Sequence, residues 1–300
     1  MTKLNSWIVA FRLRTLPLAI SSILMGSFLA IKSGSYNWVV IILAIVTTLF
    51  LQILSNLAND YGDGMRGTDN DERLGPMRTI QSGEITPKKM RFGIIVFVVL
   101  SLISGIWLIV ESLGANWDTS LLFFVLGIFA IAAAIKYTVG KNAYGYSGMG
   151  DFFVFLFFGL LAVVGTYYLI SHNLSWQILL PASTMGLFST GVLNLNNMRD
   201  MKNDARSGKN TLALSLGYQK SKKYHYIIII LGMIFALIYS GLNYASPWQF
   251  IFIITFPIFI KDLIIISGIS DKSKLDPFLK KLAFSTLIFT LLFGMGLLLS

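Results

Sequence analysis

Long apolar segments, separated by short polar ones, run through the whole chain. Most of them approach the roughly 20 residues that a helix needs to cross a bilayer. The pattern predicts an all-α, polytopic membrane protein with nine transmembrane helices, and the eighth, which contains Pro257 and an internal Lys261–Asp262 pair, is expected to be kinked or to end early. The predicted spans are Leu16–Ile31, Val39–Leu57, Phe92–Val110, Thr119–Ile135, Phe152–Ile170, Trp176–Leu195, Tyr226–Ala245, Trp248–Ile269 and Leu279–Leu299.

Composition agrees with this fold class and excludes several functions. Hydrophobic residues make up 55% of the 300 residues, charged residues only 13%, and mean hydropathy is +0.71, which a soluble domain could not carry. A nucleic-acid binder would display its basic residues on a soluble domain, and the sequence predicts none, only a single membrane domain over residues 1–300. No feature implies an obligate protein partner. The absence of cysteine excludes disulfides and thiolate metal sites.

The basic residues are distributed very unevenly between the two sides of the predicted bundle. With nine spans and an internal N-terminus, all 24 Lys and Arg residues except Lys32 fall on the inside. The positive-inside rule therefore predicts a cytoplasmic N-terminus and an external C-terminus. The same asymmetry explains the net charge of +10.

Two polar clusters follow the second and sixth spans, and each contains aspartate, asparagine and basic residues. They read NLANDYGDGMRGTD at Asn56–Asp69 and NLNNMRDMKNDARSGKNTL at Asn194–Leu212. Their separation by four helices predicts an internal duplication of residues 16–135 and 152–269, with a ninth helix at 279–299. The two clusters are then expected to face each other on the inner side.

The residue types in these clusters suit a metal-bound phosphate group. On a helix, one face carries Asn56, Asp60 and Asp63, and Asp60 follows Asn56 by four residues. The second cluster repeats this four-residue spacing between Asp200 and Asp204. Oxygen ligands of this kind suit Mg²⁺, especially when substrate phosphates complete its coordination shell. Interleaved basic residues favour a diphosphate over a bare cation: Arg66, Arg199, Lys202, Arg206 and Lys209. A solvated loop is the alternative, but two clusters of matching design make it the weaker one.

A third polar stretch, KYTVGKNAYGYSGMGD at Lys136–Asp151, joins the fourth and fifth spans on the same side. Its tyrosines are typical of membrane-interface residues. Asp151 differs, because it begins the apolar run DFFVFLFFG, where desolvation would suit a carboxylate to proton transfer.

Five motifs give the chain a specific resemblance to a known family. They are TLPLA at Thr15, QILSNLANDYGDGMRGTD at Gln52, GPMRTIQSGEIT at Gly75, YTVGKNAYGYSGMGD at Tyr137 and NNMRDMKNDARSGKNTL at Asn196. Over nearly its whole length the chain resembles the UbiA superfamily of intramembrane prenyltransferases, and most closely its dihydroxynaphthoate branch. One departure is Gly67 at the last position of the usual NDxxDxxxD motif, with Asp69 two residues later, which weakens Asp69 as a metal ligand.

The resemblance implies an Mg²⁺-dependent enzyme of menaquinone biosynthesis in the bacterial inner membrane. Such an enzyme transfers a polyprenyl group from polyprenyl diphosphate to 1,4-dihydroxy-2-naphthoate, with loss of CO₂ and diphosphate. The implied metal ligands are Asn56, Asp60, Asp63, Asp200 and Asp204. The implied substrate-binding residues are Asn59, Arg66, Arg78, Asn197, Arg199 and Lys209. The implied catalytic residues are Tyr137 and Tyr144, whose faces would stabilise an allylic cation, with Lys141 and Asp151.

Two other functions remain open at this point. A prenyltransferase of the same family could use another acceptor, such as hydroxybenzoate. A divalent-cation transporter could also use paired carboxylates, although most of the predicted spans contain no acidic residue that would carry an ion across.

Overall fold

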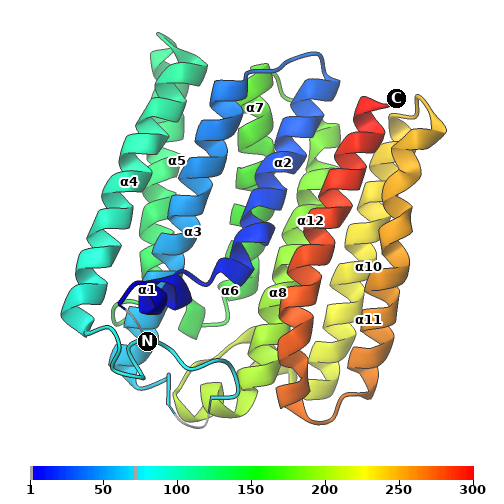
Figure 1. Ribbon diagram of the computed structural model, residues 1–300. Coiled ribbons are helices and arrows are strands. Elements are labelled where there is room, and N and C mark those ends of the chain that lie inside the picture. The colour runs from blue at the N-terminus through cyan, green and yellow to red at the C-terminus, as the bar shows by residue number, and fades with distance from the viewer. Residues whose placement is uncertain (1–2, 71–72) are drawn as a thin grey trace.

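The chain forms a bundle of long helices in a computed structural model that describes residues 3–70 and 73–300 (Figure 1). Within these ranges no strand occurs, and nine helical segments are long and apolar enough to cross a membrane. The elements are α1 (Lys3–Phe11), η1 (Leu13–Thr15), α2 (Leu16–Lys32), α3 (Trp38–Arg66), α4 (Pro87–Leu113), α5 (Trp117–Lys136), η2 (Tyr144–Tyr146), α6 (Gly150–Val154), η3 (Phe155–Val164), α7 (Gly165–Ser171), η4 (Trp176–Ile178), α8 (Leu179–Arg206), α9 (Leu212–Leu216), α10 (Tyr218–Leu242), η5 (Pro247–Thr255), α11 (Phe256–Gly268), η6 (Lys272–Leu275) and α12 (Asp276–Leu298).

The predicted spans are confirmed, and the chain is a multi-pass membrane protein. The N-terminal helix α1 and the C-terminus lie at opposite ends of the bundle (Figure 1). We call the end at which α3 and α8 finish the polar end. Both helices run past their predicted ends, α3 to Arg66 and α8 to Arg206, so the two polar clusters are helical. Gly67, in the left-handed conformation at φ 72°, ends α3.

The eighth span keeps its full length and changes helix type along it. It begins as the 3₁₀ helix η5 and continues as α11, with Pro257 in the first turn of α11. Proline is tolerated there because its missing N–H would have no partner in that turn. The span therefore reaches Gly268 without an early end.

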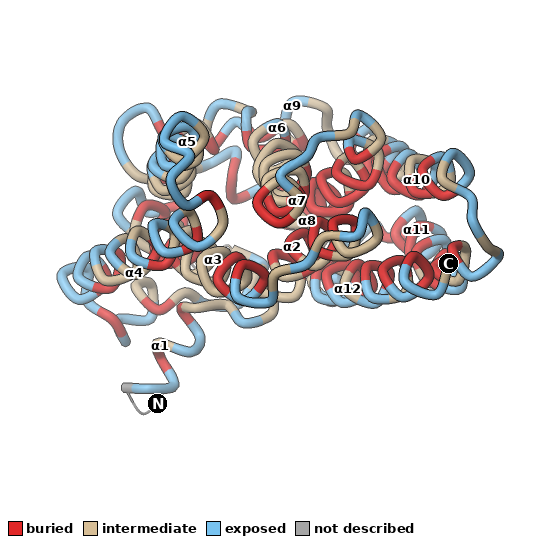
Figure 2. Tube along the Cα trace, turned by 90° about the horizontal axis from the view of Figure 1, so that it is seen from above, coloured by how far each residue is buried: buried red, intermediate tan, exposed pale blue. Residues whose placement is uncertain are grey.

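Burial distinguishes the core helices from the lipid-facing ones. Buried positions concentrate on α2, α8 and α12, whereas α4 and α5 consist mostly of exposed and half-buried positions (Figure 2). The exposed residues of α5 are mostly large and apolar, for example Leu121, Leu122 and Val125. An exposed apolar surface of this kind suits contact with lipid tails.

Two local departures from α-helical geometry shape the interior. Residues Phe155–Val164 of the fifth span form the π-helix η3. At the polar end, α1 lies across the bundle (Figure 1). It is joined to α2 by Arg12, which is left-handed at φ 52°, and by η1. A non-glycine residue in this region costs free energy, so the turn must be held by its surroundings.

Candidate active site

One cavity of about 430 Å³ extends from the polar end into the apolar bundle. Along α3 its lining runs from Ala44 to Asp63, about 28 Å of helix at the usual rise. Its inner part is mainly apolar and includes Phe157, Phe158 and Leu161 of η3. The cavity therefore joins a charged mouth to an apolar arm almost as deep as a bilayer's hydrocarbon core.

The first polar cluster places carboxylates on one side of the mouth. Asp63 lines the cavity, whereas Asp60 is buried behind it and accepts a hydrogen bond from Thr79 Oγ1 at 2.7 Å. Arg78 Nε lies 4.0 Å from Asp60 Oδ1 and 3.9 Å from Asp69 Oδ1. Burial, with Arg12 and Arg73 nearby, lowers the pKa of Arg78 well below its ordinary value. Arg78 is thus a largely buried cation with two carboxylates and two other arginines around it.

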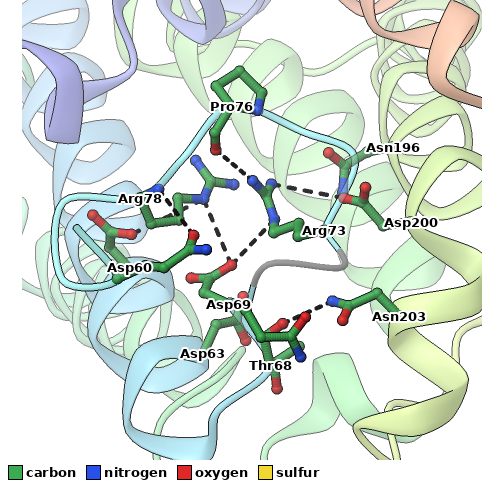
Figure 3. Close-up of polar contacts among 12 residues, drawn as sticks. Asp60, Asp63, Thr68, Asp69, Arg73, Pro76, Arg78, Asn196, Asp200 and Asn203 are labelled. Atoms are coloured by element: carbon green, nitrogen blue, oxygen red, sulfur yellow. Dashed lines mark hydrogen bonds and ion pairs between the residues drawn. The ribbon is translucent and has the colours of Figure 1, made fainter.

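Arg73 connects the two polar clusters across the mouth (Figure 3). Its guanidinium lies 3.1 Å from Asp69 Oδ1 and 3.7 Å from Asp200 Oδ2, and it donates to the carbonyl of Pro76 at 2.6 Å. The segment that follows α3 is held further by Asn203 Nδ2, which donates to Thr68 O at 2.7 Å. The predicted face-to-face arrangement of the clusters is therefore present in the structure.

Lys209 makes the second connection between the clusters. Its Nζ lies 4.0 Å from Asp63 Oδ2 and 3.9 Å from Asp204 Oδ1. Burial alone would lower the pKa of Lys209, but the two carboxylates outweigh burial and raise it. Lys209 is positioned by its backbone N–H, which donates to Asp204 O at 2.9 Å, and it remains a cation facing the cavity.

Two tyrosines of the Lys136–Asp151 stretch line the cavity. Tyr137 and Tyr144 pack edge to face with ring centroids 5.3 Å apart. Tyr137 is positioned by Thr138, whose Oγ1 donates to Ala58 O at 3.0 Å, and burial raises the pKa of Tyr137 to about 12. Both hydroxyls are therefore neutral at physiological pH, since burial also raises the pKa of Tyr144.

The carboxylates fit a divalent cation shared with a ligand better than a closed protein site. Among the described residues, no three acidic or histidine side chains converge as a ready-made metal site. However, Asp60 Oδ1, Asp69 Oδ2 and Asp204 Oδ2 are buried without a hydrogen-bond partner. Mg²⁺ commonly takes one or two carboxylates and completes its shell with water and substrate phosphates, so these oxygens fit it.

Several predicted site residues lie around the cavity in other roles. Asn59 lines the cavity, whereas Asn197 is buried outside its lining. Arg199 is fully buried, and its guanidinium donates to Asp200, Asn196 and Asp276. These contacts make Arg199 a support for the Asp200 carboxylate.

Three further predicted residues are outside the cavity lining. Arg66 and Lys141 are exposed, and Arg66 donates to the carbonyl of Gly140. Asp151 is buried, its Oδ2 has no hydrogen-bond partner, and Tyr224 of α10 lies near its carboxylate. Its catalytic role stays a prediction.

Asn56, a predicted metal ligand, lines the cavity but directs its amide nitrogen to the N-terminal segment. Nδ2 donates to Phe11 O at 2.9 Å and to Thr15 Oγ1 at 3.1 Å.

Sequence reasoning did not identify Arg12 and Arg73 as site residues, although both line the cavity. Arg12 had contributed only to the count of basic residues, and Arg73 lies in the polar segment after the first cluster. The available signal was an arginine within an otherwise apolar N-terminal stretch, which is unusual for a membrane protein.

The fold and this site define an intramembrane transferase, and the chain belongs to the UbiA prenyltransferase family, whose model matches residues 19–286. It is 42% identical to a 1,4-dihydroxy-2-naphthoate octaprenyltransferase of Haemophilus influenzae, over 99% of this chain and 96% of that protein. A protein of the same description from Escherichia coli is 38% identical over 100% of this chain and 97% of its own length. A UbiA homolog from Archaeoglobus fulgidus, solved with GPP and Mg²⁺, has a TM-score of 0.60 and 16% identity, covering 97% of this chain and 100% of that chain.

Proposed function

We propose that the protein transfers a polyprenyl group from polyprenyl diphosphate to 1,4-dihydroxy-2-naphthoate. In the net reaction the allylic C–O bond breaks, a C–C bond forms to the naphthalene ring, and the carboxyl group leaves as CO₂. The product is demethylmenaquinol, a precursor in menaquinone biosynthesis. The observation that carries this proposal is a single cavity with a charged mouth and an apolar arm, in a chain similar to named naphthoate prenyltransferases.

The mouth supplies the groups that a leaving diphosphate needs. Lys209, Arg73 and Arg78 are buried or nearly buried cations, and cations held in this way at the mouth favour an anionic ligand. Asp63, Asp200 and Asp204 would hold Mg²⁺, and Asp60 would support it from behind. Bound there, the ion would neutralise charge on the departing diphosphate as a Lewis acid.

The aromatic walls and the apolar arm would protect the allylic cation. Tyr137 and Tyr144 present ring faces and edges beside the mouth, and a neutral ring face attracts a cation. The arm along η3 would hold the prenyl tail and exclude water that could otherwise capture the cation. The naphthoate ring would then approach from the mouth.

We also propose that the polar end faces the cytoplasm of a bacterial inner membrane. All Lys and Arg residues except Lys32 belong to the side of the N-terminus by the span count, which favours this orientation under the positive-inside rule.

Product analysis by mass spectrometry tests the proposal. The purified chain, in detergent or nanodiscs, is incubated with 1,4-dihydroxy-2-naphthoate and a prenyl diphosphate, with Mg²⁺ or with EDTA. We expect a prenylated, decarboxylated naphthoquinol only with Mg²⁺. Product with hydroxybenzoate alone would overturn the acceptor. No product with any acceptor, together with metal uptake by proteoliposomes, would favour the transporter.

A further inference from the structure

Arg12 combines three features at the cavity mouth, where the carboxylates of Asp60, Asp63 and Asp69 also lie near it. It is one of two non-glycine residues with positive φ among the described residues, the other being His172. Its guanidinium lines the cavity, and its Nε and Nη2 atoms are buried without a hydrogen-bond partner. Unpartnered buried donors and a strained backbone each cost stability, so their coincidence at the cavity mouth indicates a function.

The backbone around Arg12 is held by a hydrogen-bonded clamp from α3. Thr15 Oγ1 donates to Arg12 O at 3.0 Å and accepts from Asn56 Nδ2 at 3.1 Å and Gln52 Nε2 at 3.3 Å. Asn56 Nδ2 also donates to Phe11 O at 2.9 Å. The Thr15 hydroxyl thus uses its one donor and both of its acceptor sites. These bonds fix the turn between α1 and α2.

Packing of α1 closes the other side of the turn. Trp7 lies against Gly93 of α4, where a Cβ would come within 2.8 Å of the indole. Phe11 packs edge to face on Phe97, with ring centroids 5.3 Å apart. The turn is therefore held from two sides, by Gln52 and Asn56 of α3 and by the packing of α1 against α4.

We propose that Arg12 is an oxyanion-binding residue of the cavity, and that Gln52, Asn56 and Thr15 are positioning residues that keep its turn left-handed. The ligand is a carboxylate or phosphate group presented at the mouth. This inference rests on the proposed function for its two candidate sources, the naphthoate carboxylate and the prenyl diphosphate. In this proposal Asn56 acts through its amide nitrogen, which holds the turn. As a metal ligand it would act through its amide oxygen.

The test measures binding by the full-length protein and does not depend on turnover. Three probes are compared in nanodiscs: 1-hydroxy-2-naphthoate, 1-naphthol, which lacks the carboxylate, and inorganic pyrophosphate with Mg²⁺. Arg12→Gly removes the guanidinium and suits the positive φ, so the turn between α1 and α2 should keep its conformation. His172→Gly is the matched control, because it relieves the same backbone conformation at a residue that does not line the cavity.

Loss of one charge-assisted contact should weaken one probe by about 10- to 100-fold in Arg12→Gly. Weaker binding of 1-hydroxy-2-naphthoate, with unchanged binding of 1-naphthol, identifies the carboxylate as the ligand. Weaker binding of pyrophosphate identifies the diphosphate. Both results support the proposal. Unchanged affinity for all three probes overturns it. If Arg12→Gly does not fold, Arg12→Asn replaces it, since asparagine tolerates the left-handed region.

The positioning residues are tested by a double-mutant cycle. Gln52→Met removes the amide donor, and Asn56→Asp removes Nδ2 while retaining an oxygen that a metal could use. When Arg12 is present, we expect each substitution to weaken binding of the Arg12-dependent probe. When it is added to Arg12→Gly, it should have no further effect on that binding. Equal effects in both backgrounds would exclude positioning through Arg12.

The two proposals fail in different ways. Arg12-dependent binding in a protein that makes no prenylated naphthoquinol would overturn the proposed function alone. Normal turnover with Arg12-independent binding would overturn only this inference.

Discussion

Carboxylates and cations alternate around the cavity mouth. Lys209 lies between Asp63 and Asp204, and Arg73 lies between Asp69 and Asp200. Each cation can therefore contact a phosphate oxygen while a neighbouring carboxylate limits the cost of its burial. Because the pKa of Lys209 is raised, its charge is present throughout the physiological pH range.

The Asp204 carboxylate provides the sharpest single-residue test of the metal site. Asp204→Asn keeps the size of the side chain and removes its charge, and the wild-type Oδ2 has no hydrogen-bond partner to lose. We expect turnover to fall at least about 100-fold. Thermal stability should fall as well, because Lys209 Nζ loses one of its two carboxylate partners. Turnover is measured by product formation at saturating Mg²⁺. Asp118→Asn, exposed at the other end of the bundle, is the matched control, and equal turnover in both variants would exclude Asp204 from the site.

Tyr137 is expected to act through its ring and not through its hydroxyl. Its pKa of about 12 makes it a poor base at neutral pH. Tyr137→Phe should therefore retain most of the turnover, whereas Tyr137→Leu should lose about 2- to 30-fold, the range of one cation–π contact. Single-turnover kinetics with one prenyl diphosphate distinguish the variants. A large loss in Tyr137→Phe would instead assign the hydroxyl a direct role.

At the scale of elements, apolar length predicted where the spans are but not where their helices stop. Hydropathy falls at Leu57 and Leu195, yet α3 and α8 continue to Arg66 and Arg206. Backbone hydrogen bonding and the cap at Gly67 determine those ends. Similarly, sequence could mark Arg12 as unusual but could not place Arg12 or Arg73 in the cavity, because separate segments of the chain come together there.

Close contact between the fifth and sixth spans gives an element-scale prediction. A Cβ on Gly159 of η3 would lie 2.7 Å from Ala182 O and 2.8 Å from Gly186 Cα on α8. Gly159→Val should therefore overpack this interface, at about 1–3 kcal/mol, and lower the melting temperature. Differential scanning fluorimetry in detergent measures the effect. Gly241→Val is the control, because a Cβ there meets nothing within 4 Å, and equal melting of the two variants would contradict the tight contact.

At the scale of the whole molecule, the two halves meet at the cavity. The second span, α3, and the sixth, α8, each end in a polar cluster at the same mouth. We propose that residues 16–135 and 152–269 derive from a duplication, since this relation would place equivalent helix ends opposite each other. Because the two halves share one mouth, polar substrate groups reach the cavity from one side of the membrane.

The side itself can be determined because the chain contains no cysteine. Single cysteines at Ala115, exposed beyond α4, and Ser82, exposed at the polar end, would be the only thiols. If the polar end is cytoplasmic, a membrane-impermeant maleimide should label Ala115→Cys in spheroplasts that retain an intact inner membrane, and Ser82→Cys only after permeabilisation. Detergent-solubilised samples control for thiol reactivity. The reverse labelling would invert the orientation, and it would also require the naphthoate acceptor to reach the cavity from outside the cell.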